Sequence, residues 1–599
     1  MSSRSAAEAP PRWDLSDLYA GPDAAELKKD LAAAREGVAA FAKAHQGRIA
    51  SMAEDAAGGG RLADAIAEYE RLEETIGRIG SYAGLLHAAN TSDPKVAKIY
   101  GDLQAQLSDI TAPLLFFQLE LNGLDEARLE ALMAEPRLRR YAPWLKDVRD
   151  FKPYQLNEEI ERAFFEKDLT GRAAWVRLYD ETLAGLRFSV GGEQVPLEEA
   201  LNSLSDENRA TRERAAGALA EGFKPALPVF TTVLNTLAKD KEIDDRWRGI
   251  ADPALSRHVA NHVEPEVVAA LVAAVREAFP RLSHRYYAMK AKWLGLGKLE
   301  YWDRNAPLPF TADRKFAWGE ARDLVLDAYD GFSPDLGRLA RRFFEEPWID
   351  AEARPGKASG AFSHPTVPSA HPYILLNFKG KTRDVMTIAH ELGHGVHQLL
   401  SAPQGALMAG APLTLAETAS VFGEMLAFRR LLDTAKSADE RRALLAGKVE
   451  DMLNTVVRQI AFYRFESEVH RQRKEGELTA DDVARIWLDV QTESLGPAFA
   501  FADGYERYWC YISHFFHAPF YVYAYAFGDG LVNALYARYR EAESGFVGRY
   551  LDLLKAGGSK RHKELLAPFG LDATDPGFWA MGLSVIEGLI DELEAGGGA

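Results

Sequence analysis

The sequence HELGH at residues 390–394 constrains this chain more than any other stretch. On an α-helix, residues four apart lie on one face with Cβ atoms roughly 6 Å apart, so His390 and His394 can share one metal ion. Imidazole nitrogens about 2.0–2.1 Å from the ion suit zinc. Glu391 lies about 100° round the helix from His390, where its carboxylate can take a proton from a water that the metal acidifies.

The surroundings of this motif predict a well-formed helix. Residues 373–378 (YILLNF) are typical of a buried strand, residues 380–381 of a turn, and Thr382 or Asp384 of a helix N-cap. Apolar residues then recur at helical spacing up to residue 400. The alternative is that the two histidines only cap, pair with acids or pack in a core. Because the helix places both on one face, we predict a catalytic metal site.

A third protein ligand must come from further along the chain, since a catalytic zinc commonly has three. The pattern HExxHxxGxxH is absent, because positions 397 and 400 are His and Leu. Glu417, 23 residues after His394, is the best candidate and lies on a second predicted helix, residues 413–427. A rival interpretation is a capping box in which Glu417 pairs with Thr414.

Two more residues are expected to support this site. Glu424 lies seven residues after Glu417 on the same helical face, where it can orient a histidine by accepting its other N–H. His397 borders the face that carries His394. We interpret His397 as a supporting or structural residue rather than a ligand.

Composition excludes several other classes of protein. The chain has 599 residues, 47% of them hydrophobic and 27% charged, as in a soluble globular protein of three or four domains by length alone. A formal charge of −17 without a long basic run argues against nucleic-acid binding. No window offers about 18 consecutive apolar residues, and the N-terminus lacks the apolar region of a signal peptide. We therefore expect a cytoplasmic protein without a membrane span.

The single cysteine, Cys510, has the same implication. One cysteine excludes an intrachain disulfide and a thiolate zinc cluster, and it fits a reducing compartment. Because Cys510 lies among aromatic residues, we expect an inert buried thiol and not a nucleophile.

Helical spacing dominates the chain, so we predict a mostly α protein with a small β-sheet beside the metal helix. Residues 1–12 are expected to be a disordered N-terminus and residues 595–599 a flexible tail. A boundary near residue 195 separates an N-terminal helical lobe, residues 13–195, from a catalytic domain, residues 196–594.

Glycines make two local predictions. Residues 187–196 (RFSVGGEQVP) indicate a small hairpin with a Gly-Gly turn. Residues 58–60 (GGG) indicate a loop, and not a phosphate cradle, because no strand precedes them and no G-K-[ST] follows.

The combination of HELGH with ETASVFGE at residues 417–424 resembles the thimet oligopeptidase/oligoendopeptidase F family of zinc metallopeptidases. The resemblance extends from Trp13 to about residue 585. It includes four further segments: residues 13–19 (WDLSDLY), 356–362 (GKASGAF), 375–378 (LLNF) and 514–525 (HFFHAPFYVYAY).

This resemblance implies a two-lobed helical ellipsoid with a deep substrate channel and one Zn²⁺ on the channel floor. It implies His390, His394 and Glu417 as zinc ligands and Glu391 as the general base. Narrow access would restrict substrates to short unfolded peptides, which are cut at internal bonds.

The aromatic segment 514–525 has two interpretations. Core packing is the default for such a run. Tyr521 and Tyr525, however, are four apart and share a helical face, and the resemblance implies that they and His514 bind the substrate and the developing oxyanion. A phenol suits that role because it is a neutral donor at pH 7. His517 and Tyr523 are further candidates for substrate binding.

The expected reaction is hydrolysis by a metal-activated water. Glu391 takes the water's proton and passes it to the leaving amine, while Tyr525, with Tyr521, stabilises the oxyanion. The strand around Gly360 and Phe362 is expected to pair with the peptide backbone. One alternative is a metallocarboxypeptidase with a similar channel. Another is an idle peptide-binding protein with a structural metal, which the intact Glu391 disfavours.

Overall fold

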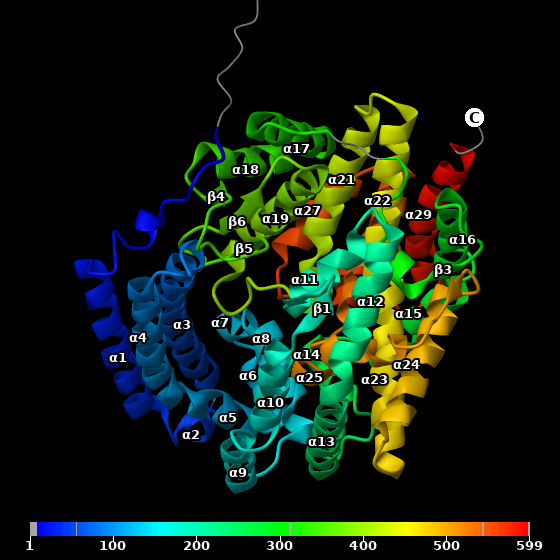
Figure 1. The fold of residues 1–599 in the computed structure, drawn as a ribbon. Coiled ribbons are helices and arrows are strands. Elements are labelled where there is room, and N and C mark those ends of the chain that lie inside the picture. Colours follow the sequence, from blue (N-terminus) through cyan, green and yellow to red (C-terminus); the bar gives the residue numbers. More distant parts are fainter. Residues whose placement is uncertain (1–8, 56, 311–313, 542–543, 597–599) are drawn as a thin grey trace, which may run out of the picture. The chain divides into compact units, whose positions relative to one another are not determined.

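The computed structural model describes the chain except residues 1–8, 56, 311–313, 542–543 and 597–599 (Figure 1). In the described part, helices predominate and three small sheets occur, which confirms the predicted mostly α class. The chain forms two compact units, each built from three segments: unit 1 from residues 1–152, 313–434 and 538–571, and unit 2 from residues 153–312, 435–537 and 572–599. The predicted boundary near residue 195 stays a prediction.

Unit 1 is built from helices that precede and follow a three-stranded sheet. Its α-helices are α1 (Ala25–His45), α2 (Ile49–Met52), α3 (Gly58–Ala89), α4 (Pro94–Thr111), α5 (Leu115–Gly123), α6 (Glu126–Leu132), α7 (Pro136–Arg139), α8 (Ala142–Asp150), α17 (Trp318–Phe332), α18 (Pro334–Glu345), α19 (Thr382–Ser401), α20 (Leu413–Ala416), α21 (Thr418–Asp433), α27 (Phe546–Lys555) and α28 (His562–Leu566). Its 3₁₀ turns are η1 (Leu15–Asp17), η2 (Ala112–Leu114), η7 (Ala402–Gln404) and η9 (Ala567–Phe569).

The start of α3 corrects one prediction. Residues 58–60 were expected to form a loop, but they make the first turn of α3. A Cβ at Gly59 would lie 2.8 Å from the Leu132 carbonyl oxygen, and one at Gly58 would lie 2.7 Å from that of Met52. These glycines therefore permit close packing inside a helix, which their sequence cannot distinguish from turn formation.

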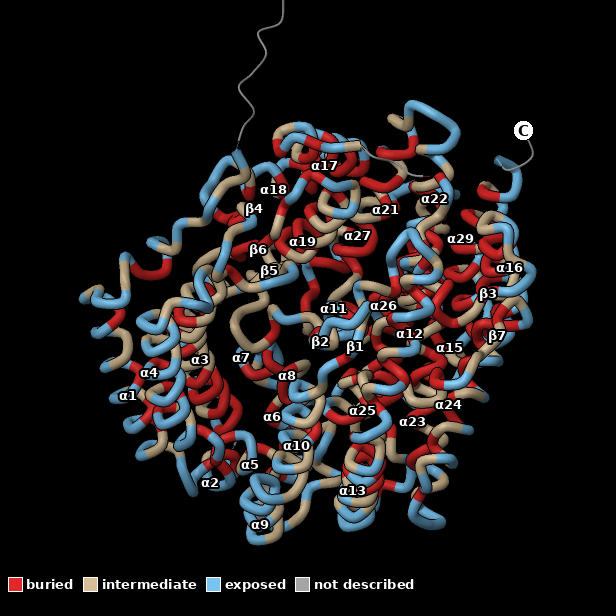
Figure 2. The backbone as a smooth tube through the Cα atoms, in the orientation of Figure 1, coloured by how far each residue is buried: buried red, intermediate tan, exposed pale blue. Residues whose placement is uncertain are grey.

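The sheet of unit 1 leads directly into the helix that carries HELGH. Its strands are β4 (Ile349–Glu352), β5 (Phe362–His364) and β6 (Tyr373–Phe378), in the order β4-β6-β5, with β6 parallel to β4 and antiparallel to β5. The central strand β6 is the one predicted at residues 373–378, and it is largely buried (Figure 2).

The turn from β6 to α19 fixes where the motif begins. Gly380 has φ of 75°, and a Cβ there would lie 2.7 Å from the Phe316 carbonyl oxygen, so the turn requires glycine. Helix α19 begins at Thr382, and the Asp384 carboxylate accepts from the Lys381 N–H at 2.9 Å. Of the two predicted N-cap residues, Asp384 is the one that caps the helix, and its side chain does so from within the first helical turn.

Unit 2 contains the remaining helices and two small sheets. Its α-helices are α9 (Glu158–Asp168), α10 (Arg172–Gly185), α11 (Leu197–Asn202), α12 (Arg209–Phe223), α13 (Leu227–Trp247), α14 (Leu255–Ala260), α15 (Pro265–Ala278), α16 (Ser283–Trp293), α22 (Ala438–Thr455), α23 (Val457–Glu475), α24 (Ala480–Leu495), α25 (His514–His517), α29 (Pro576–Ala595) and most of α26 (Tyr523–Arg540). Its 3₁₀ turns include η4 (Ser203–Ser205), η5 (Lys224–Ala226), η6 (Tyr301–Asp303) and η8 (Tyr505–Tyr511), and η3 (Lys152–Tyr154) begins it.

The strands of unit 2 confirm the predicted hairpin. Strands β1 (Phe188–Val190) and β2 (Glu193–Val195) are antiparallel, and the Gly-Gly turn between them has φ of 63° and 94°. A two-residue hairpin turn with positive φ at both positions favours glycine. The other pair, β3 (Leu299–Glu300) and β7 (Phe499–Ala500), is parallel.

An aromatic core fills part of unit 2 and encloses Cys510. Trp487, Trp509 and Phe515 belong to this core, and Cys510 is fully buried in it. Burial raises the pKa of the Cys510 thiol well above its ordinary value, which disfavours the reactive thiolate. Across the described helices, none is both long and apolar enough to cross a bilayer.

Candidate metal centre

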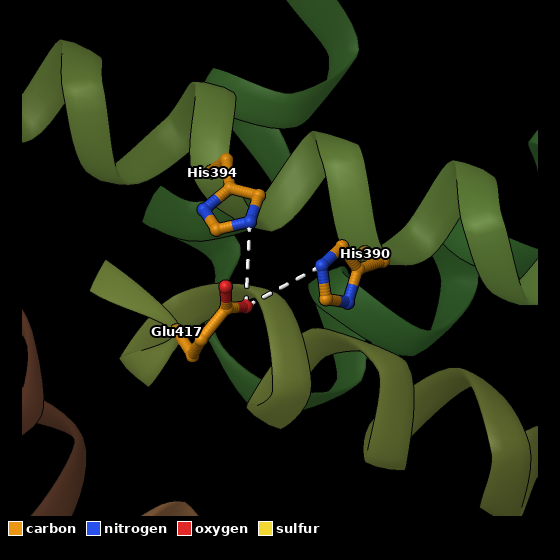
Figure 3. Close-up of side chains that lie close together, drawn as sticks. All are labelled: His390, His394 and Glu417. Carbon is orange, nitrogen blue, oxygen red and sulfur yellow. Dashed lines mark ion pairs between the residues drawn. The ribbon is translucent and has the colours of Figure 1, made fainter. Parts of the chain in front are cut away.

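The two motif histidines and Glu417 converge on one point in unit 1. The Nε2 atoms of His390 and His394 each lie 3.4 Å from Oε2 of Glu417 (Figure 3). In a tetrahedral zinc site with bonds of about 2.0–2.1 Å, neighbouring ligand atoms are about 3.3–3.4 Å apart. The donor set and its spacing therefore fit zinc.

Close packing of α19 against α21 brings Glu417 to the histidines. A Cβ at Gly393, inside the motif, would lie 2.4 Å from the Ala419 carbonyl oxygen and 2.6 Å from Cα of Ser420. Only glycine allows this approach. The sequence analysis assigned no role to Gly393, although its place on the helix between the two histidines was an available signal.

Glu417 lies at a break and not inside a continuous helix. Helix α20 ends at Ala416 and α21 begins at Thr418, and Glu417 between them has ψ of −1°. The prediction of one helix over residues 413–427 is therefore wrong at this position. The Glu417 carboxylate accepts from the Ser420 hydroxyl at 2.6 Å and faces the histidines, an arrangement that replaces the rival capping box.

Glu424 lies behind the first histidine. Its Oε2 is 3.2 Å from Nδ1 of His390, so a proton on Nδ1 is held there and Nε2 faces Glu417. A carboxylate in this position fixes the tautomer and the ring orientation of a histidine ligand. The seven-residue spacing between Glu417 and Glu424 predicted this placement.

The charges of His390, His394 and Glu417 strongly affect one another's protonation. Burial opposes ionisation of Glu417, but the hydrogen bond and charge of His394, with the charge of His390, outweigh it and lower the pKa of Glu417 to about 2. Burial also opposes charge on His390, yet Glu424 and the other carboxylates raise its pKa. The carboxylate of Glu417 is therefore ionised and available to a cation at neutral pH.

Glu391 is 7% exposed and lies on the same helix as the histidines. Burial raises the pKa of its carboxyl, and the positive charges of His390 and His394 only partly oppose this. A carboxyl with a raised pKa is suited to accept a proton and return it.

His397 lies next to the cluster without joining it. It is buried, and burial lowers the pKa of its ring to about 4, so it is neutral. His394, His397 and Gln398 line a cavity of about 330 Å³, together with residues of the segment 365–372. Gln398 also accepts from the Ser363 hydroxyl at 2.9 Å, which ties β5 to α19.

Gly360 and Phe362 lie at the outer edge of the sheet. Strand β5, which begins at Phe362, is the edge strand beside β6. Gly360 has φ of 80°, and its carbonyl oxygen accepts from the Asn377 amide at 2.9 Å. The ring of Trp13 lies 6.4 Å from that of Phe362. An edge strand can pair with an extended peptide.

In unit 2, the structure groups His514, Tyr521 and Tyr525. Nε2 of His514 lies 3.3 Å from the Tyr525 hydroxyl oxygen, and the rings of Tyr521 and Tyr525 are 5.2 Å apart. The predicted shared helical face is wrong, because α26 begins only at Tyr523. A turn at Phe520, with φ of 59°, brings Tyr521 to the others instead.

His517 and Tyr523 point to other partners. Tyr523 is fully buried, with its hydroxyl 3.0 Å from Nδ1 of His258 and 2.9 Å from the Asn261 amide nitrogen. Burial raises the pKa of Tyr523. His517 pairs with Asp180 at 2.7 Å. Tyr521, and not Tyr523, is therefore the tyrosine grouped with His514 and Tyr525.

Comparisons with known proteins agree with the geometry. A family model described as Peptidase family M3 matches residues 203–585, and one described as Oligopeptidase F matches residues 120–188. The oligopeptidase PepF of Bacillus subtilis (strain 168) is 26% identical over 609 residues, which cover 99% of this chain and 88% of the relative. The chromosomal oligoendopeptidase F of Lactococcus lactis subsp. cremoris is 27% identical, with 65% of each chain covered.

Solved structures show the same fold. A putative peptidase from Chlamydophila abortus matches with a TM-score of 0.85 and 23% identity, over 98% of both chains. The oligoendopeptidase-F from Enterococcus faecium matches with a TM-score of 0.70 and 22% identity, over 95% of this chain and 97% of the other.

These findings define the class of the protein, a metalloendopeptidase with a helical fold and an HExxH helix. Because one family model covers more than half of its length, the chain belongs to peptidase family M3. The resemblance predicted from the sequence is confirmed.

Proposed function

We propose that this chain hydrolyses internal bonds of short unstructured oligopeptides, with one zinc ion held by His390, His394 and Glu417. The observation that carries the proposal is the 3.4 Å spacing of Glu417 Oε2 from both Nε2 atoms, which fits tetrahedral zinc. Relatives named oligopeptidase and oligoendopeptidase support the substrate class. The charge of −17 and the single buried Cys510 support action in the cytoplasm without nucleic-acid partners.

A zinc ion held by His390, His394 and Glu417 would supply Lewis acidity and would lower the pKa of a water toward about 7. Glu391, with its raised pKa, takes the proton of that water and returns it to the leaving amine. Glu424 holds the ring of His390 through Nδ1, and Ser420 holds the Glu417 carboxylate.

Substrate binding is assigned to two groups of residues. The edge of β5, from Gly360 to Phe362, pairs with the peptide backbone, which gives tolerance for different side chains. By the family resemblance, His514, Tyr521 and Tyr525 hydrogen-bond the substrate and the developing oxyanion. The contact of His514 with the Tyr525 hydroxyl supports a further role for His514 in orienting that tyrosine.

The test is mass spectrometry of a mixed peptide library, with peptides of roughly 5 to 30 residues, before and after chelation of the metal. Internal cuts confined to short peptides, lost on chelation and restored by Zn²⁺, are expected. Stepwise loss of C-terminal residues would instead indicate a metallocarboxypeptidase. No metal-dependent cleavage would indicate a binding protein.

The Glu391→Gln variant tests the role of the base. It should keep its zinc, because Glu391 is not a ligand, and lose activity by about 10²–10⁴-fold. Zinc content by mass spectrometry and the cleavage rate are measured on the same sample. Normal activity in this variant would contradict the assignment.

A further inference from the structure

Unit 2 contains a small cavity lined by two arginines that come from distant parts of the chain. Arg304 follows η6 and Arg458 lies on α23. The cavity holds about 10 Å³, which is roughly the room that one water-sized particle occupies. Asn454, Gln491 and Ser494 contribute polar atoms to its wall.

Neither guanidinium has an acidic partner among the described residues. Arg304 donates to the Asn454 side-chain oxygen and to the Tyr287 hydroxyl, and Arg458 donates to the Tyr511 hydroxyl at 3.3 Å. All three partners are neutral. Two positive charges therefore meet at one cavity without a carboxylate to balance them, although an arginine keeps its charge at neutral pH.

Two buried cations of unit 2 have acidic partners. Arg212 pairs with Asp303 at 2.9 Å, and the fully buried ammonium of Lys290 pairs with Glu450 at 2.6 Å. Arg304 and Arg458, which are half-buried, have no acidic partner among the described residues. Burial lowers the pKa of Arg458 and the charge of Arg304 lowers it further, whereas burial of Arg304 is outweighed by neighbouring tyrosines, Tyr287 first, which raise the pKa of Arg304.

Two buried N–H donors at the cavity also lack partners. Nε of Arg458 and Nε2 of Gln491 have no hydrogen-bond acceptor in the described structure. Gln491 is 2% exposed, and its Oε1 accepts from the Tyr505 hydroxyl at 3.0 Å, so its amide N–H groups remain for the cavity. Buried donors are almost always satisfied by an acceptor, so one is missing here.

We propose that this cavity binds a small monovalent anion of the chloride class, held by Arg304, Arg458 and the Gln491 amide. A single ion of that size satisfies both unpartnered donors and balances part of the charge. The volume excludes sulfate, phosphate and the carboxylate end of a peptide. The proposal concerns unit 2 alone and does not depend on the peptidase chemistry.

The first test is thermal unfolding of the zinc-loaded protein in sodium chloride and in sodium gluconate at equal ionic strength. Gluconate is too large for the cavity. Saturating chloride should raise Tm by about 2–4 °C over gluconate, because a ligand that binds only the folded state stabilises it. Equal Tm values in the two salts would overturn the proposal.

Gln491→Glu is the decisive variant, because it places a carboxylate at the cavity without a change of shape. This variant should lose the chloride-dependent rise in Tm, since its own charge replaces the ion. Gln194→Glu makes the same chemical change at an exposed position of β2 and should keep the full rise. A Gln491→Glu protein that still gains the full rise would contradict the site.

Asn454→Asp serves in the same role if Gln491→Glu does not fold, because Asn454 already bonds to Arg304.

A third measurement needs no variant. Crystals grown in sodium bromide should show an anomalous peak between Arg304 and Arg458, whereas density without an anomalous signal would mean a water only and would overturn the proposal.

Discussion

Single side chains behind the metal ligands decide which atoms face the ion. Glu424 is the clearest case, because its carboxylate 3.2 Å from Nδ1 of His390 leaves Nε2 for the metal. A neutral amide at this position accepts the same hydrogen bond more weakly and lowers the basicity of the ring.

Glu424→Gln should therefore lower zinc affinity by about 10–100-fold. Asp433→Asn is a matched control, because it also removes one charge from α21 but lies exposed at the end of that helix. Competition with a chelator of known affinity measures both. Zinc affinity of Glu424→Gln within twofold of the control would contradict the orienting role.

The buried His470 makes the free energy of unfolding depend on pH. His470 on α23 packs with its ring 4.8 Å from that of Phe520, and burial, with the charges of Lys241 and Lys474, lowers its pKa to about 3. The unfolded chain takes up a proton near pH 6.5 and the folded protein does not. The contribution of neutral His470 to the free energy of unfolding is therefore complete above pH 6.5 and is lost as the pH falls toward 3.

His470→Phe should remove this part of the pH dependence. Between pH 6.5 and 4.5 the wild type should lose about 2–3 kcal/mol more unfolding free energy than the variant. Urea unfolding at both pH values measures the difference, and loss of zinc at low pH affects both proteins alike. Parallel losses in the two proteins would show that His470 is protonated when folded.

At the scale of elements, the contact of α19 with α21 forms the metal centre. Gly393 lies where the two helices touch, and an added Cβ would lie 2.4 Å from a backbone oxygen, which has no flexible end to move aside. The helices must separate to accept any side chain there. The spacing of Glu417 from the histidines depends on this one position.

Gly393→Ala should thus weaken zinc binding more than it weakens the helix itself. Gly447→Ala on α22 is the control, since nothing lies within 4 Å of its added Cβ and alanine stabilises a helix interior by about 0.5–1 kcal/mol. We expect at least a tenfold loss of zinc affinity in the first and none in the second, measured by chelator competition. Unchanged affinity in Gly393→Ala would show that the helices can adapt.

Elements with a strong local pattern were predictable from the sequence. Strand β6, the HELGH helix and the β1–β2 hairpin follow from apolar spacing and from the Gly-Gly turn. Glycines 58–60 were misjudged because the packing that requires them, against Leu132 and Met52, lies outside the local sequence. The break at Glu417 and the turn at Phe520 were missed because no residue type nearby demands them.

At the scale of the whole molecule, the division into units separates the candidate sites. His390, His394 and Glu417 belong to unit 1, and the arginine pair belongs to unit 2. The arginine pair was invisible in the sequence, since Arg304, Arg458 and Gln491 are far apart along the chain. By contrast, HELGH and Glu417 are close enough in sequence for helical geometry to connect them.

Removal of zinc should accordingly loosen unit 1 selectively. A ligand stabilises the part of the structure that it binds, and local stability differs between cooperative units. Hydrogen-exchange mass spectrometry with and without a chelator should show faster exchange in peptides from α19 and α21 and little change in the β1–β2 hairpin. Equal acceleration in both would mean that the two units unfold as one.

The alternation of the two units along the chain bears on its synthesis. Unit 1 needs residues up to 571 and unit 2 needs residues up to 599, so neither can be completed while the C-terminal segments are still inside the ribosome. A growing chain must therefore hold α1 to α8 as a partial structure until its later partners emerge. For the same reason, a nonsense mutation before residue 571 would leave both units incomplete, whereas in a protein of consecutive domains it would spare the first.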